Sequence, residues 1–306
     1  MAANKGFITV ATGKDRYYIL AHNLLRSYRF HAKSPMPFAI ICDRANEWTA
    51  DFDSVVIVET PTRSYMDKMR ILDLSPFDET LFVDADSLAF RDLNEMWSLF
   101  EDSPDVGVVG VTFPLDSKEG WWDVKNLGEL QNKVDYKMIC QGGVYYVRKC
   151  GKELPGFIDT CRFIEQHYSE YHFRVFGAIL ADEPIMSLAS CVHHYMPLKH
   201  WTEIFAYYPY TQNLSADIVS GHVAFNWTES PEHRFMNSFL IHFGTVYARH
   251  RWLYKREVFK LKRGPVGLSN LWDYLLLWSN HKWHKLAMTF FRIFKIKRKI
   301  IMEVYE

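Results

Sequence analysis

The sequence lacks the features of secreted, membrane-spanning and cysteine-zinc proteins. Its five cysteines (Cys42, Cys140, Cys150, Cys161 and Cys191) are odd in number and show no C-x-x-C spacing. This pattern favours free thiols in a reducing compartment. The start, MAANKGFITVATGKD, has no charged-then-apolar leader, and no apolar run reaches the length of a transmembrane helix, about 20 residues. We therefore expect a cytoplasmic protein.

The chain has no net charge, but its charges are unevenly distributed. Residues 249–306 hold 14 basic and 4 acidic side chains, whereas the rest of the chain holds 22 and 32. We expect a main domain over residues 1–262 and a basic, aromatic helical tail over 263–306. Two interpretations of the tail stay open: helices resting on an anionic membrane surface, at the inner face of a membrane, or packing on the acidic body of the same chain. We expect no nucleic-acid partner.

Short apolar β-type runs alternate with helical patterns in the first third of the chain. The runs are KGFITVAT, PFAIICD, SVVIVE and TLFVDAD, and the helical patterns cover residues 16–30 and 64–74. This order predicts an α/β protein with a mainly parallel central sheet flanked by helices. Neither G-x-G-x-x-G nor G-K-[ST] follows the first run. A dinucleotide fingerprint and a P-loop are therefore excluded there.

Two acids, Asp84 and Asp86, stand where the apolar run LFV ends. Side chains two residues apart point to the same side of an extended chain, so both carboxylates face one point. Their repulsion is costly unless a cation lies between them or their hydrogen-bonding roles differ. A divalent metal ion fits this requirement. The alternative is that the acids form a turn or cap a helix that starts in SLAFRDLNEMWSLF.

Five blocks of sequence resemble the retaining glycosyltransferases of family 8, which include glycogenin and bacterial lipopolysaccharide galactosyl- and glucosyltransferases. The resemblance covers residues 6–252, and the blocks occur in the family's order. They are TVATGKDRYYILAHNLLRSY, KMRILDLSPFDETLFVDADSLAF, QGGVYYV, ADEPIMS and LIHFGTVYARHRW. In the second block Lys68 precedes Asp84 by sixteen residues, as the family's lysine precedes its first metal-binding aspartate.

The resemblance implies a GT-A fold, a nucleotide-diphospho-sugar transferase of Rossmann-like architecture. It implies that a Mn²⁺ or Mg²⁺ ion is held by Asp84, Asp86 and His242, and that the donor is a UDP-sugar. Carboxylates and an imidazole suit such an ion, and Mn²⁺ tolerates the nitrogen better. The other residues that the resemblance places at the donor are Ala11, Thr12, Asp15, Tyr17, Lys68, Ala85, Gly143 and Gly244. Near the donor sugar it places Gln141, Asp182 and Glu183 as catalytic residues.

Three positions depart from the family pattern. Gln141 replaces an asparagine, and Glu183 replaces a glutamine. A glutamate at 183 is a competent nucleophile, so double displacement and front-side attack by the acceptor both stay open. The family's closing Gly-x-x-Lys-Pro-Trp is degraded to GTVYARHRW, which makes Arg249 and Arg251 our candidates for the cation at the diphosphate.

The sequence thus predicts a metal-dependent hexosyltransferase that uses a UDP-sugar and a glycan, a glycolipid or another hydroxyl acceptor, with retention of anomeric configuration. Two alternatives stay open. A nucleotidyl- or phosphotransferase can use the same acid pair, although such an enzyme normally has a Gly-rich or Lys-rich phosphate loop. The second alternative is an inactive sugar-nucleotide-binding module.

Overall fold

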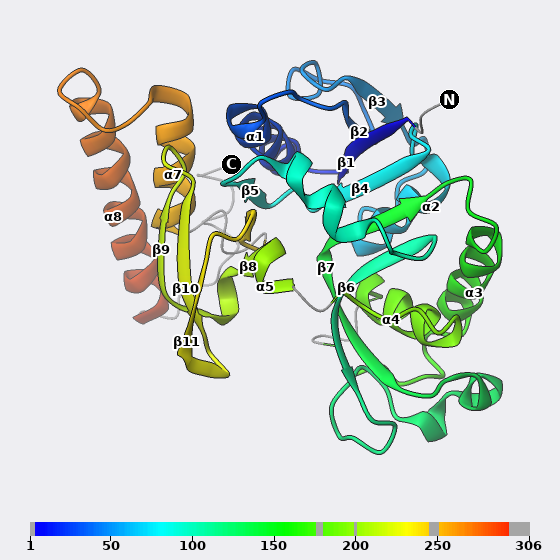
Figure 1. The fold of residues 1–306 in the computed structure, drawn as a ribbon. Coiled ribbons are helices and arrows are strands. Elements are labelled where there is room, and N and C mark those ends of the chain that lie inside the picture. The colour runs from blue at the N-terminus through cyan, green and yellow to red at the C-terminus, as the bar shows by residue number, and fades with distance from the viewer. Residues whose placement is uncertain (1–3, 176–179, 199–200, 245–250, 294–306) are drawn as a thin grey trace.

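A six-stranded sheet in the order β3-β2-β1-β4-β7-β6 forms the centre of the molecule (Figure 1). The computed structural model describes residues 4–175, 180–198, 201–244 and 251–293. Strands β1 to β4 are parallel, and β7 is antiparallel to both of its neighbours. The predicted mainly parallel sheet is therefore confirmed. The strands are β1 (Lys5–Ala11), β2 (Phe38–Cys42), β3 (Ser54–Ile57), β4 (Glu79–Val83), β6 (Val106–Phe113) and β7 (Lys137–Arg148).

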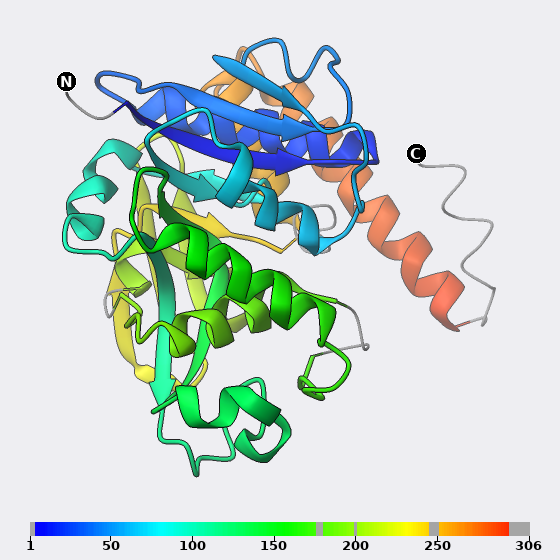
Figure 2. The same ribbon diagram turned by 90° about the vertical axis from the view of Figure 1, so that its right-hand side faces the viewer.

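Helices cover both faces of this sheet, as Figure 2 shows from the side. Alternation along β1 sends Phe7 into one apolar core and Ile8 into the other. The first core contains residues of α1 (Asp15–His31) and α7 (Trp252–Arg263). The second contains residues of η1 (Tyr65–Arg70), α2 (Ile71–Leu74), α3 (Leu154–Gln166) and α4 (Asp182–Val192).

Two small sheets extend the first core. One has the order β5-β12-β8, with β5 (Ser87–Ala89), β12 (Leu240–His242) and β8 (Phe205–Tyr207). The other is antiparallel, with β11 (Ser230–Met236), β10 (His222–Trp227) and β9 (Thr211–Asp217). The second sheet lies in the chain between β8 and β12. The remaining short elements are η2 (Leu93–Phe100), η3 (Val124–Asn126), η4 (Gly128–Lys133), α5 (Trp201–Ile204) and η6 (Tyr208–Tyr210).

Local hydrogen bonding modifies two of the predicted helices. The helical pattern at 64–74 forms the 3₁₀ helix η1 followed by the short α2. Ser64 caps η1 because its side chain accepts a hydrogen bond from the Met66 N–H. Downstream of Asp86 the chain first forms β5 and then the 3₁₀ helix η2, where Asp92 is the cap.

The C-terminal helices are fixed to the body through α7. The carboxylate of Glu257 is fully buried and accepts the Ile218 N–H at 2.7 Å. Helix α8 (Leu271–Ile293) packs on α7 through Tyr274, whose ring lies 5.5 Å from both Trp252 and Phe259. Figure 1 shows α8 on the outer side of α7. No helix in the described part of the chain has the length and apolar character that crossing a membrane requires.

Candidate metal and sugar-nucleotide site

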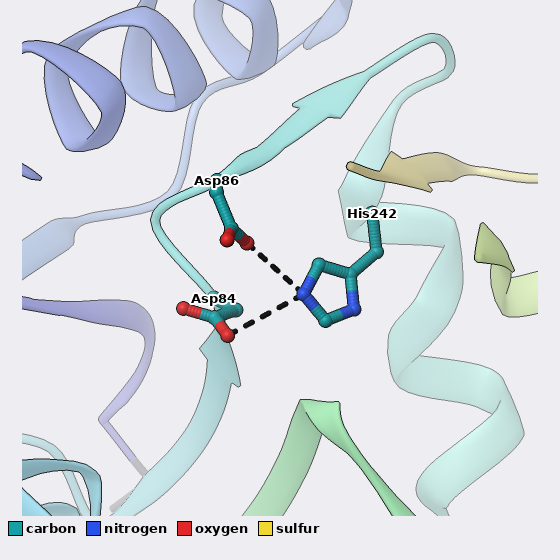
Figure 3. A group of neighbouring side chains, drawn as sticks. All are labelled: Asp84, Asp86 and His242. Atoms are coloured by element: carbon teal, nitrogen blue, oxygen red, sulfur yellow. Dashed lines mark ion pairs between the residues drawn. The ribbon is translucent and has the colours of Figure 1, made fainter. Parts of the chain in front are cut away.

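Strand pairing brings Asp84, Asp86 and His242 together (Figure 3). Asp84 directly follows β4, and Asp86 directly precedes β5. His242 ends β12, which pairs with β5 so that His242 lies opposite Ser87. The imidazole Nε2 lies 3.0 Å from a carboxylate oxygen of Asp86 and 3.5 Å from one of Asp84. Three donors from sequence positions up to 158 apart thus face one point.

This cluster fits a divalent ion. One ligand atom of each residue lies within 4.8 Å of the other two. Burial lowers the pKa of His242, but the carboxylates of Asp86 and Asp84 outweigh burial and raise it to about 10. Without an ion the imidazole thus carries a positive charge between the two acids, and a metal ion at this point would replace the proton on Nε2. Two carboxylates and an imidazole are a donor set that suits Mn²⁺, and also Mg²⁺ less well.

Lys68 links this cluster to a second pair of acids. Its ammonium nitrogen lies 2.5 Å from Asp84 Oδ2 and 3.4 Å from the carbonyl oxygen of Gly142. Burial alone lowers the pKa of Lys68, but the charges of Asp182 and Asp84 raise it well above its usual value. The structure therefore places Lys68 beside the candidate metal ligands as a permanently charged cation.

Asp182 and Glu183 form the second acid pair, in the first turn of α4. Tyr145 donates its hydroxyl to Asp182 Oδ2 at 2.8 Å, and the Gly142 N–H donates to Glu183 Oε1 at 2.7 Å. Burial, together with the charge of Asp182, raises the pKa of Glu183 to about 7. Burial also raises the pKa of Asp182. Glu183 is thus held by the backbone of β7 and is only partly ionised near neutral pH.

Because residues 142 and 143 are glycines, β7 packs directly against both the Asp84–Asp86–His242 cluster and the second acid pair. A Cβ atom on Gly143 would lie 2.8 Å from His242 Nδ1, and one on Gly142 would lie 2.9 Å from Asp182 Oδ2. The Gly143 carbonyl also accepts the Asp84 N–H at 2.9 Å. The sequence QGG therefore has a packing role at the cluster. Gln141, half-buried on the same strand, directly precedes the pair.

The first loop is held by hydrogen bonds within the protein. Ala11 ends β1 and is buried, and the Thr12 hydroxyl donates to Asp67 at 2.7 Å. Asp15 pairs with Arg44 at 2.5 Å, and the Tyr17 hydroxyl accepts a hydrogen bond from Arg16 at 2.8 Å.

Arg44 and its neighbour Asp43 also shape the loop, and neither was predicted as a site residue. Arg44 donates to the Gly13 carbonyl at 2.7 Å, and Asp43 accepts the Gly13 N–H at 3.2 Å. Gly13 has a φ of +84°, which favours glycine. The backbone turn after β1 is therefore fixed in place.

Other predicted positions lie around the cluster or outside the described residues. Ala85 is buried between the two aspartates, and Gly244 follows β12 with a φ of +69°. Arg251 is exposed at the start of α7, with its guanidinium 5.8 Å from the ring centre of Tyr208. Arg249 falls outside the described residues.

Two tyrosines at the cluster were missed by the sequence predictions. Tyr207 lies opposite His242 in the parallel pairing of β8 and β12, with its ring centre 5.0 Å from the imidazole. Tyr65 is about half exposed, and the Lys68 ammonium lies 5.7 Å from its ring centre. Strand β8 is only three residues long, and its place beside β12 depends on long-range pairing. Sequence patterns therefore gave no signal for Tyr207.

No family model matches the chain, and no curated protein matches it in sequence. The chain is similar in structure to the galactosyltransferase LgtC, solved with donor and acceptor sugar analogs: the TM-score is 0.51 at 11% identity, over 87% of this chain and 98% of that one. It is also similar to mouse xyloside xylosyltransferase 1, with a TM-score of 0.50 at 10% identity, over 79% of this chain and 98% of that one. At identities this low, the structural similarity shows the fold alone. The chain has the GT-A glycosyltransferase fold, as the sequence predicted.

Proposed function

We propose that the chain is a metal-dependent glycosyltransferase that moves a hexose from a UDP-sugar to a hydroxyl group of a glycan or glycolipid, with retention of anomeric configuration. The observation that carries the proposal is the Asp84–Asp86–His242 cluster at the end of β4 in a GT-A fold. A bound Mn²⁺ or Mg²⁺ ion supplies Lewis-acid neutralisation of the leaving diphosphate. Asp84, Asp86 and His242 hold the ion.

The neighbouring side chains orient the donor. Lys68, charged and next to Asp84, adds a second positive charge for the diphosphate. Asp182 uses Oδ2 for Tyr145, so Oδ1 is the oxygen that we assign to a donor-sugar hydroxyl. Gln141 lies at the start of the glycine pair and supplies an amide for the same sugar. Tyr17, Thr12 and Asp15 remain our assignment for the base and ribose side, with Arg251 near the diphosphate.

Glu183 is better placed as a support than as a nucleophile. Its Oε1 atom is hydrogen-bonded to the Gly142 N–H, and its raised pKa leaves a fraction of the carboxyl groups protonated at neutral pH. A nucleophile must be ionised and free to approach the anomeric carbon. We therefore favour front-side attack by the acceptor hydroxyl. Double displacement through Glu183 is the mechanism to be tested against it.

The two alternative functions have less support. A nucleotidyl- or phosphotransferase needs groups that bind a transferred phosphate, but the loop after β1 directs its polar groups at Asp43, Asp67 and Arg44. An inactive binding module has no need for three converging metal ligands next to a buried lysine. The phosphotransferase predicts a different ligand, and the inactive module predicts binding of the sugar nucleotide without turnover, so a single binding and turnover experiment separates them from the proposed function.

A panel of UDP-, GDP- and CMP-sugars, assayed for release of the nucleoside diphosphate or monophosphate with and without Mn²⁺, tests the proposal. We expect release from a UDP-hexose that requires the metal. The Asp86→Asn variant is the matched control, because it removes one ligand charge with little change in volume. Release of UDP without metal, or equal release by this variant, would contradict the metal assignment.

Helix α8 supports the membrane interpretation of the tail. Six large apolar side chains are exposed on it: Leu271, Trp272, Leu275, Leu276, Trp278 and Trp283. At 100° per residue Trp272, Leu276 and Trp283 fall opposite Tyr274, which contacts α7, and the other three extend this face toward Tyr274. Tryptophans and leucines on one face of a basic helix are typical of helices that lie in a membrane interface. We infer that this face binds anionic lipid at the inner side of a membrane.

Substituting serine for Trp272, Leu276 and Trp283 together tests this assignment. These side chains are 78%, 58% and 69% exposed, so the change leaves the contact with α7 intact. We expect weaker sedimentation with phosphatidylserine vesicles and unchanged binding of UDP with Mn²⁺. Equal vesicle binding by the wild type and the variant would contradict the membrane interpretation and favour packing of the tail on the body of the same chain.

A further inference from the structure

A series of aromatic rings leads from the metal cluster to the protein surface. The ring centre of Tyr207 lies 5.0 Å from that of His242, Tyr210 lies 5.4 Å from Tyr207, and Trp227 lies 5.8 Å from Tyr210. Exposure increases from His242 to Tyr210, and Trp227 is half-buried. His242 is 7% exposed and Tyr207 is half-buried, whereas Tyr210 is 44% exposed. We call Tyr207, Tyr210 and Trp227 the aromatic strip.

Chain topology explains why the strip begins at the cluster. β8 ends at Tyr207, opposite His242, and the chain then turns through η6 into β9. Trp227 ends β10 and pairs with Thr211, the first residue of β9. The three-stranded sheet β9–β10–β11 is therefore joined to the cluster through the strip. This sheet is inserted in the chain between β8 and β12, the strand that carries a metal ligand.

The strip borders the cluster on the side of the second acid pair. Tyr207 contacts the ring of His242, and His242 packs on Gly143, which adjoins the Gly142 N–H that holds Glu183 at 2.7 Å. Tyr65, by contrast, begins η1, which the hydrogen bond from Thr12 to Asp67 joins to the loop after β1. Tyr65 thus faces the loop that we assign to the nucleotide. The donor nucleotide occupies that side, so the side of Tyr207 remains for the second substrate.

We propose that the aromatic strip is the acceptor subsite, where a pyranose ring stacks on Tyr210 and Trp227 with its attacking hydroxyl directed past Tyr207 toward Glu183 and the cluster. This proposal rests on the proposed function, whose second substrate it places. Sugars present an apolar C–H face and a polar rim, and tyrosine and tryptophan match both with a flat apolar ring and a hydrogen-bonding group. A bare hydrophobic patch would lack that polar match.

Binding of the full-length chain to an array of synthetic oligosaccharides, ending in galactose, glucose or N-acetylglucosamine, tests the strip. The protein is applied with UDP and Mn²⁺. We expect the wild type to bind a subset of these glycans, and the Tyr210→Ala variant to bind the same subset about tenfold more weakly, since one aromatic contact is lost. Tyr210→Phe keeps the ring and should retain binding to within about twofold.

Two controls make the outcome specific. Phe30 is 49% exposed near the far end of α1, so Phe30→Ala removes an equally exposed ring away from the strip and should leave glycan binding unchanged. The thermal shift with UDP and Mn²⁺ is measured on every variant. If Tyr210→Ala keeps that shift and binds glycans as the wild type does, or if the wild type binds none of them, the strip is not the acceptor subsite. Absence of the shift in the wild type contradicts the proposed function instead.

Discussion

Replacing Glu183 by glutamine separates a structural role of this side chain from a chemical one. The two side chains have nearly the same shape, so the glutamine oxygen can accept the Gly142 N–H that Glu183 accepts at 2.7 Å. The substitution removes only the negative charge. That charge lies in a buried position next to Asp182, which accounts for the raised pKa of Glu183.

The magnitude follows from the pKa values. Folding raises the pKa of Glu183 from 4.5 to about 7, so the folded protein holds a proton that the unfolded chain has lost. Stability of the wild type is therefore full below pH 4.5 and falls as the pH rises toward 7, by about 3 kcal/mol in all. Glutamine avoids this loss. At pH 8 the variant should be more stable by about 3 kcal/mol, equivalent to about 6 °C in Tm, and at pH 5 by only about 1 kcal/mol.

Thermal unfolding of both proteins at pH 5 and pH 8, without metal or nucleotide, measures the stability difference. Turnover with the UDP-sugar identified by the donor panel measures the chemical role. We expect the variant to bind the donor normally and to turn over within about threefold of the wild type. A Tm difference that does not depend on pH would refute the electrostatic reasoning. A hundredfold loss of turnover with normal donor binding would refute front-side attack and establish Glu183 as a participant in the chemistry.

Three further changes have defined outcomes. Gly143→Ala places a methyl group 2.8 Å from His242 Nδ1, so metal-dependent UDP binding, measured by calorimetry, should weaken about tenfold or more. Lys68→Met leaves Asp84 without its partner at 2.5 Å, and the metal-free protein should lose about 3 kcal/mol of stability in urea unfolding, most of which Mn²⁺ restores. Deleting residues 265–306 should abolish vesicle sedimentation and preserve UDP binding; loss of both would mean that α8 supports the fold.

The central sheet was predictable because each strand carries its own local signal. KGFITVAT, PFAIICD and TLFVDAD are short apolar runs between turns, and burial on both faces keeps them apolar throughout. The helix α1 was predictable for a similar reason. The 3₁₀ character of η1 was not, because it depends on the buried Asp67, which accepts hydrogen bonds from Thr12, Thr62 and Arg63. Such contacts between distant segments produce no periodic pattern in the sequence.

The site was predictable only where short motifs carry it. Asp84 and Asp86 share one motif, and sequence order together with a family resemblance connected them to His242. The position of Tyr207 beside His242 depends on the register of β8 against β12, and the contact of Arg44 with the loop after β1 depends on the reach of its side chain. Neither residue belongs to a motif. Long-range pairing of single side chains is the part of a site that one sequence does not reveal.

Binding of UDP together with Mn²⁺ tests the central assignment most directly. At a ligand concentration one hundred times Kd, the ligand should stabilise the wild type by about 2.7 kcal/mol, or about 5 °C in Tm, and neither UDP alone nor ATP with Mn²⁺ should do so. Asp86→Asn removes one of the two carboxylates that face His242 and should abolish the shift while its circular dichroism matches that of the wild type. An equal shift in this variant, or a shift that persists in EDTA, would contradict a metal site built from Asp84, Asp86 and His242.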